Sequence, residues 1–201
     1  MKKEQKKMYK VDPIVIKSAI ETLERNGFVI GEKLKFNFYE PLANIKAIGD
    51  YLLGELEITD SFVKVAEYLQ DTQGKHLCLL GGVGTGKTLL ATKILPLLFQ
   101  MQYNKIFTCI KAVNLAEELK TAKRYNFVII DDVGTESDAV EYGNKISQFS
   151  EWIDTLEGRK CMSIITTNLS AEQIKQRYGL RTYDRIRGLF KVITFNEKSM
   201  R

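Results

Sequence analysis

The sequence predicts an α/β fold built around a parallel β-sheet. From about residue 76 onward, apolar strand-like runs alternate with helical patterns. This alternation is typical of parallel strands joined by crossover helices. A glycine-rich turn within Leu77–Leu90 separates the first of these strands from the next helix, which is the arrangement of a phosphate-binding loop.

The glycine-rich turn satisfies the pattern G-x-x-x-x-G-K-[ST] and ends on Gly86-Lys87-Thr88. Backbone N–H groups of such a loop surround phosphates, and the helix N-terminus behind it adds its positive dipole end. We expect Lys87 to reach the β- and γ-phosphate oxygens and Thr88 to bind Mg²⁺. The residues expected to hold the nucleotide are Gly81, Gly82, Val83, Gly84, Thr85, Gly86, Lys87, Thr88 and Leu89.

Length and composition indicate a globular protein with one substantial core. The chain has 201 residues, and no apolar run approaches the ~20 residues of a membrane-spanning helix. We therefore expect a cytoplasmic protein with no membrane partner. The three cysteines lie in or beside apolar runs, so we expect core thiols and neither a disulfide framework nor a metal centre.

The positive charge is concentrated at the two ends of the chain. Residues 1–10 carry five lysines and one glutamate, and residues 171–201 carry eight basic and three acidic side chains. This distribution is compatible with nucleic-acid contact, and solvated chain ends explain it equally well.

The segment before the phosphate-binding loop has a different pattern. We expect 1–10 to form a basic flexible arm because it contains little to bury. We expect a small, mainly helical segment over 11–72, followed by the nucleotide-binding domain over 73–201. Asp12 and Pro13 suit the start of a helix. The predicted elements are a helix from the Asp12 cap to the stop at Gly27, helices at Pro41–Gly54 and Asp60–Asp71, and an extended stretch at Phe28–Phe38.

The next four elements surround the phosphate-binding loop. Pro96 lacks a backbone donor, so we expect the first helix after the loop to bend or end near it. Asn114 is expected to cap the second helix. In order, the predicted elements are strand His76–Leu80, helix Lys87–Gln100, strand Lys105–Ile110 and helix Leu115–Lys123.

The apolar run Phe127–Asp132 ends in two carboxylates and is the second nucleotide-binding pattern. A buried parallel strand would bring Asp131 to the sheet edge beside the loop, where it can hold the water shell of Mg²⁺ or meet the metal through Thr88. Asp132 would then polarise the attacking water. Glu136 follows closely, and either acid could serve as the general base. The alternative is that two adjacent acids merely end a strand before a turn.

A polar side chain follows the next predicted strand. Asn168 would lie between the phosphate-binding loop and the carboxylates, where an amide can orient water against the γ-phosphate. Ser170 and Gln173 form a capping box for the helix that follows. Trp152 is expected to anchor the core. The predicted elements here are helix Asp138–Leu156, strand Cys161–Thr166 and helix Ala171–Tyr178.

Two arginines precede the last predicted strand, Lys191–Phe195. Arg181 and Arg185 are four residues apart and so share one helix face. Such a pair can project to the γ-phosphate of a neighbouring subunit, as an arginine finger does. A solvated basic helix explains the pair equally well.

Five blocks of the chain together resemble the helicase-loader branch of AAA+ ATPases, the DnaC/DnaI-like and IstB-like proteins. The resemblance extends over about residues 75–201. The matching blocks are Gly81–Thr88, Ile129–Glu136, Thr166–Ser170, Arg177–Arg185 and Lys198–Arg201.

The resemblance implies an AAA+ core with a five-stranded parallel sheet in the order 5-1-4-3-2, flanked by helices, and ATP with Mg²⁺ as ligands. It implies that Asn168 is sensor 1, that Arg185 is the arginine finger with Arg181 beside it, and that Arg201 is a sensor-2-like arginine. Because the sequence stops at Arg201, no C-terminal lid is expected. Asp132 stands where many AAA+ proteins carry glutamate, which predicts slow hydrolysis.

The resemblance also implies a function in DNA replication. In the leading hypothesis, 11–72 docks a replicative helicase, and the ATPase core associates with copies of itself on single-stranded DNA through an ATP-bridged interface. Three alternatives stay open. One is an IstB-like helper ATPase with a transposase as its partner, and another is an ATP-dependent interaction module that hardly hydrolyses. The third is a small-molecule kinase that shares the loop.

Overall fold

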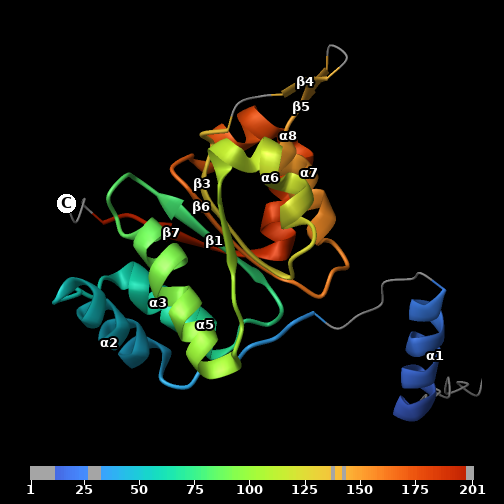
Figure 1. The fold of residues 1–201 in the computed structure, drawn as a ribbon, viewed down its shortest axis with the longest axis horizontal. Helices are drawn as coiled ribbons and strands as arrows, with labels where there is room; N and C mark the ends of the chain where they lie inside the picture. Colours follow the sequence, from blue (N-terminus) through green and yellow to red (C-terminus); the bar gives the residue numbers. More distant parts are fainter. Residues whose placement is uncertain (1–11, 27–32, 137–138, 142–143, 198–201) are drawn as a thin grey trace, which may run out of the picture. The chain divides into compact units, whose positions relative to one another are not determined.

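The computed structural model describes residues 12–26, 33–136, 139–141 and 144–197 (Figure 1). The chain divides into two units, Met1–Glu32 and Lys33–Arg201, which are described separately. The first unit contains helix α1 (Pro13–Arg25). The Oδ1 atom of Asp12 accepts a hydrogen bond from the backbone N–H of Ile14 at 2.8 Å, which confirms the predicted start of this helix.

The second unit is organised around a five-stranded parallel sheet. The strand order is β2-β3-β6-β1-β7, which confirms the predicted sheet and its order. The edge strands are therefore β2 and β7, and β1, the strand before the phosphate-binding loop, lies inside the sheet between β6 and β7. The five strands are β1 (His76–Gly81), β2 (Thr108–Lys111), β3 (Phe127–Val133), β6 (Met162–Thr167) and β7 (Phe190–Phe195).

Helices cover both faces of this sheet, and each face has its own core (Figure 1). Side chains alternate between the faces along each strand, so Leu77 and Leu79 pack in one core while Cys78 packs in the other. The first face carries α2 (Pro41–Leu53), α3 (Asp60–Gln70), the π-helical turn η1 (Leu90–Ile94) and α5 (Leu95–Tyr103). The second carries α6 (Leu115–Ala122), α7 (Gln148–Leu156) and α8 (Ala171–Leu189).

The segment before β1 belongs to the same core as the sheet. Phe36 and Phe38 are buried against Phe99 of α5, with ring centroids 5.2 and 4.7 Å apart. The backbone N–H of Phe36 donates to Oγ1 of Thr72 at 2.9 Å. The structure therefore divides near residue 32, whereas the sequence led us to place the boundary of the nucleotide-binding domain at residue 72.

The region after β3 differs from the predicted helix Asp138–Leu156. An antiparallel pair, β4 (Ala139–Glu141) and β5 (Asn144–Ile146), precedes α7, which begins only at Gln148. The hydroxyl of Ser147 caps α7 by accepting a hydrogen bond from the N–H of Ser150 at 3.3 Å. The apolar periodicity that predicted a long helix thus continues across a cap residue, and only its second half is helical.

The helix that follows the loop continues past Pro96. A short α4 (Lys87–Leu89) leads into the π-helical turn η1, and α5 runs on to Tyr103. Pro96 lies in the first turn of α5, so the wider π turn accommodates the missing backbone donor without ending the helix. A 3₁₀ turn, η2 (Ala112–Asn114), precedes α6, and Asn114 makes no side-chain capping bond, contrary to our expectation.

Two further details concern the second face. The Ser170–Gln173 capping box of α8 is confirmed, and the helix continues beyond the predicted end at Tyr178 with a kink at Gly179, where φ is 83°.

Cys78 and Cys161 are buried as expected, but Cys109 is exposed because it lies on the edge strand β2. Among the helices that the structure describes, none is both long and apolar enough to cross a bilayer.

His76 is a buried histidine at the start of β1, with 5% of its surface exposed. Its Nδ1 accepts a hydrogen bond from the backbone N–H of Ser163 at 3.2 Å, and its ring packs against Phe190 at 5.0 Å between centroids. Burial lowers the pKa of His76 to about 4, with a smaller contribution from the charge of Lys33. The neutral imidazole is therefore the form that fits the folded protein.

This histidine should make folding stability depend on pH below neutrality. Between pH 6.5, its ordinary pKa, and about 4, the unfolded chain binds a proton that the folded protein excludes, so stability falls as pH decreases. The loss by pH 4 should be about 3 kcal/mol. Urea unfolding of the wild type and of His76→Asn, whose Oδ1 can replace Nδ1, should show a weaker pH dependence in the variant. Equal pH dependence would contradict this assignment.

Candidate nucleotide-binding site

The phosphate-binding loop follows β1 and ends where α4 begins. Two of its glycines are required by the backbone. Gly86, the residue before α4, has a φ of 91°, and Gly81 has a φ of 151°. A Cβ atom on Gly81 would lie 2.3 Å from the carbonyl oxygen of Phe195 on the neighbouring strand β7. The loop therefore needs glycine both for its left-handed turn and for its contact with the sheet.

Lys87 is the buried cation of the loop. Its Nζ donates to the carbonyl oxygen of Gly82 at 2.5 Å and to Oγ1 of Thr85 at 3.3 Å. Burial lowers the pKa of Lys87, and the nearby charges of Asp132 and Asp131 oppose that shift. The ammonium group therefore lies within the loop, close to both carboxylates, where it can meet an anionic ligand.

Asp131 lies at the end of β3 beside the loop, as predicted. Its Oδ1 accepts hydrogen bonds from Oγ1 of Thr88 at 3.0 Å and from Oγ1 of Thr166 at 2.7 Å. Hydroxyl and carboxylate oxygens are the ligands that Mg²⁺ prefers, so the chemistry of this pair fits the metal. The structure thus brings together the two residues predicted to bind Mg²⁺.

Asp132 has an unusual backbone conformation. Its φ is 66°, and the pairing of β3 with β6 shifts register between Ile130 and Val133. The backbone N–H of Asp132 donates to Oγ1 of Thr166 at 2.8 Å, and its Oδ1 accepts from Nδ2 of Asn168 at 2.9 Å. The predicted water-orienting amide and the predicted water-polarising carboxylate therefore contact each other.

Lys87, Thr88, Asp132 and Asn168 line one cavity of about 700 Å³, and Asp131 adjoins it through its hydrogen bonds to Thr88 and Thr166. Its wall also includes a segment that the sequence did not suggest, at and after the C-terminal end of α2. The backbone N–H of Leu56 donates to Oδ1 of Asp50 at 2.7 Å, which fixes this segment. The lining residues from this segment are Leu53, Glu55, Leu56 and Glu57, and the others are Val83 to Leu89, Asp132, Thr166 and Asn168.

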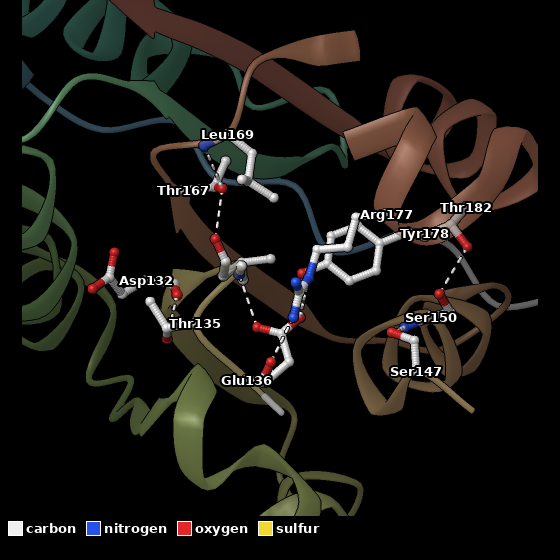
Figure 2. Close-up of polar contacts among 12 residues, drawn as sticks. Asp132, Thr135, Glu136, Ser147, Ser150, Thr167, Leu169, Arg177, Tyr178 and Thr182 are labelled. Carbon is white, nitrogen blue, oxygen red and sulfur yellow. Dashed lines mark hydrogen bonds and ion pairs between the residues drawn. The ribbon is translucent and has the colours of Figure 1, made fainter. Parts of the chain in front are cut away.

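The Glu136 side chain contacts Tyr178 and Arg177 of α8 and not the phosphate-binding loop. Its buried side chain accepts hydrogen bonds from the hydroxyl of Tyr178 and, at 2.8 Å, from the backbone N–H of Gly134, and it pairs with Arg177 (Figure 2). In Figure 2 the Asp132 carboxylate points away from this cluster. Glu136 is absent from the cavity wall that the structure describes. Of the two acids that the sequence offered as general base, Asp132 lines the cavity and Glu136 does not.

Arg181 and Arg185 of α8 both contact Asp154 of α7. Nη2 of Arg181 lies 3.4 Å from the Asp154 carboxylate, and Arg185 pairs with Asp154 and, at 3.3 Å, with Glu157. The Arg181 side chain is 76% exposed, whereas that of Arg185 is 25% exposed. Neither arginine lines the cavity of its own chain in the part described. Arg201 lies outside the described residues.

Solved structures with similar folds include the DnaC helicase loader. It superposes with a TM-score of 0.59 at 17% identity, over 72% of this chain and 95% of that chain. This chain has the fold of the DnaC helicase loader. The DnaI structure gives a TM-score of 0.57 at 19% identity, over 83% of this chain and 96% of that chain. Comparisons of the sequence with family models and with curated proteins find no match.

A DnaA structure extends this likeness to a protein with a bound nucleotide analogue. AMPPCP-bound DnaA from Aquifex aeolicus gives a TM-score of 0.53 at 18% identity, and the match covers 73% of this chain and 50% of that one. At these identities the likeness to DnaC, DnaI and DnaA concerns the fold. The roles of individual residues rest on the geometry of the site.

Within the DnaC-like fold, the sequence located the loop, both carboxylates and Asn168, because each follows a strand in a recognisable pattern. It did not single out Leu53, Leu56 or Thr166 as site residues. Leu53 and Leu56 belong to a segment without a motif, and Thr166 is a strand residue whose hydroxyl matters only through its contacts. A signal for Thr166 was its polarity at the end of an apolar strand.

Proposed function

We propose that this chain is an ATP-hydrolysing AAA+ protein that acts in the cytoplasm as a helicase loader in DNA replication. In this proposal it delivers a replicative helicase to single-stranded DNA. The observation that carries the proposal is the convergence of Lys87, Thr88, Asp132 and Asn168 on one cavity, with Asp131 bonded to Thr88 beside it, in a fold shared with helicase loaders.

The proposed chemistry assigns each of these groups a task. Loop N–H groups and the Lys87 ammonium bind the phosphates, while Thr88 and Asp131 hold Mg²⁺. The metal neutralises charge on the phosphate oxygens when it is bound. Asp132, oriented by Asn168, accepts a hydrogen bond from the attacking water and aligns it with the γ-phosphate. The segment around Leu56 provides a wall for the nucleoside.

We propose that a second copy of the chain completes this site. The α8 arginines lie outside the cavity of their own chain, as required of groups that act on a neighbour's γ-phosphate. We assign Arg185 as the arginine finger, with Arg181 beside it. Arg185 must then leave Asp154 and Glu157 when the subunits meet, so these acids hold it in the single chain.

We further propose that residues 11–72 dock the helicase. Within this segment, α1 belongs to a unit separate from the sheet. Its Ile14, Val15 and Ile16 side chains are 76%, 59% and 46% exposed. Consecutive exposed apolar side chains of this kind are typical of a surface that another protein covers.

A second candidate is an ATP-dependent interaction module that hardly hydrolyses. Asp132 favours this alternative, because its side chain is one methylene shorter than glutamate and its Oδ1 already accepts a bond from Asn168. In that case ATP binding alone would control the partner, and the same cavity would serve as a switch.

Single-turnover hydrolysis, with protein in excess over ATP, separates these two functions. We expect slow turnover that single-stranded DNA accelerates, and a loss of about 10²-fold or more in Asp132→Asn. The host's replicative helicase should bind the wild-type chain in the presence of ATP. No turnover with or without DNA, together with ATP-dependent helicase binding, would favour the interaction module. Binding of a transposase in place of the helicase would favour the IstB-like alternative.

A further inference from the structure

The hydroxyl of Thr166 connects the two carboxylate residues of β3. It donates to Oδ1 of Asp131 at 2.7 Å and accepts the backbone N–H of Asp132 at 2.8 Å. Thr166 is 1% exposed. A hydroxyl has one hydrogen to donate, and an ionised carboxylate can only accept, so the directions of both bonds are determined.

Thr166 also accounts for the conformation of Asp132. A residue other than glycine with a φ of 66° is strained unless its surroundings hold it in place. The register shift between Ile130 and Val133 marks a β-bulge, where regular pairing with β6 is interrupted. A side chain of β6, that of Thr166, accepts the N–H of Asp132 at this point and thereby closes the bulge.

The bulge has a consequence for the two carboxylates. Successive residues of a regular strand point to opposite faces of a sheet. Here Asp131 contacts Thr88 of the loop, and the next residue, Asp132, contacts Asn168 at the same end of the sheet. The buried hydroxyl of Thr166 therefore bonds to both acidic residues. Asp131 is the one beside Thr88, and Asp132 is the one beside Asn168.

We propose that Thr166 is a positioning residue that sets Asp131 for Mg²⁺ and Asp132 for the attacking water at the same time. Both described hydrogen bonds to Asp131 fall on Oδ1, so Oδ2 is the oxygen that would hold the metal or its water. The expected effect of Thr166 on the hydrolysis rate rests on the proposed ATPase function. Its expected effect on the Mg²⁺ dependence of binding requires only that the chain binds a nucleotide.

Thr167 offers a matched control on the same strand. It is also 1% exposed, and its hydroxyl donates to the carbonyl oxygen of Val133 at 2.7 Å and accepts from the N–H of Leu169 at 3.1 Å (Figure 2). It contacts neither carboxylate. Thr166→Val and Thr167→Val thus remove equally buried hydroxyls with similar bonds, and Thr166→Ser restores the hydroxyl.

The experiment measures the binding of a fluorescent ATP analogue across a Mg²⁺ titration, and single-turnover hydrolysis, in the full chain. In EDTA, the affinity of Thr166→Val for the analogue should lie within about twofold of the wild-type affinity. The Mg²⁺ concentration that gives half of the Mg²⁺-dependent change in binding should be about 10-fold higher than for wild type. Its hydrolysis rate should fall about 10²-fold. Thr166→Ser and Thr167→Val should stay within about threefold of wild type on both readouts. Urea unfolding of all variants checks that they are folded.

The possible failures differ. If Thr166→Val and Thr167→Val show the same Mg²⁺ dependence, the role of Thr166 is overturned whether or not the protein hydrolyses ATP. If the wild type shows Mg²⁺-dependent nucleotide binding without turnover, the proposed hydrolysis fails, and the Mg²⁺ titration still decides the role of Thr166. If the wild type binds no nucleotide at all, both proposals fall.

Discussion

Lys87→Ala should lower the affinity for ATP by about 10²-fold, because removing a charge-assisted hydrogen bond costs about 1.5–3 kcal/mol and the buried ammonium is placed to make at least one with the phosphates. The effect should be larger for ATP than for ADP, since the lysine is expected to reach the β- and γ-phosphates. Titration of a fluorescent ATP analogue measures both affinities.

Lys93→Ala is a suitable control for this variant. Lys93 lies on the same helical stretch, one and a half turns beyond the loop, and its side chain is exposed. Lys93→Ala removes one positive charge, as Lys87→Ala does, but Lys93 does not line the cavity. The nucleotide affinity of Lys93→Ala should therefore match that of wild type. An unchanged affinity in Lys87→Ala, with this control also unchanged, would contradict the phosphate-binding assignment.

Arg185→Ala should leave nucleotide affinity near wild type while lowering the hydrolysis rate by about 10³-fold, the effect of removing an arginine finger. Arg185 lies outside the cavity of its own chain. Under the proposed shared site it would therefore contribute only when a neighbouring chain approaches. Hydrolysis by the wild type should accordingly rise more steeply than linearly with protein concentration. Single-turnover rates over a range of concentrations measure this dependence.

Two comparisons make this result specific. Arg187→Ala removes an exposed arginine of α8 that contacts the Tyr183 ring and not Asp154, so this variant should hydrolyse ATP like wild type. Arg185→Lys keeps the charge but loses the planar two-pronged contact, and should stay impaired. A loss in Arg185→Ala that is equally large for dilute single chains would instead show that Arg185 acts within its own chain.

The sequence predicted the sheet and most of the site because both depend on local patterns. Apolar runs identify parallel strands, and the residues that end them, such as Asp131 and Asn168, must meet at one edge of the sheet. Strand order followed from the family resemblance, and the structure confirms it. These parts of the fold needed no knowledge of side-chain contacts.

The parts that escaped prediction depend on contacts between distant segments. Helical periodicity before α7 is ambiguous until the Ser147 cap is seen. Glu136 follows the two carboxylates of β3 closely in the sequence and so resembles a second catalytic acid. Its side chain instead contacts Tyr178 and Arg177, more than forty residues later in the chain. The N–H of Asp132 at the bulge bonds to Thr166 on another strand, and no spacing in β3 alone reveals this contact.

The measurement that tests the central proposal most directly is hydrolysis by an equimolar mixture of Lys87→Ala and Arg185→Ala chains. Lys87→Ala binds little ATP but keeps its arginine, whereas Arg185→Ala binds ATP but lacks the arginine. If a second copy completes the site, the mixture should hydrolyse ATP at a substantial fraction of the wild-type rate, well above either variant alone. If the mixture stays as inactive as its components while both are folded, the shared ATP site is contradicted.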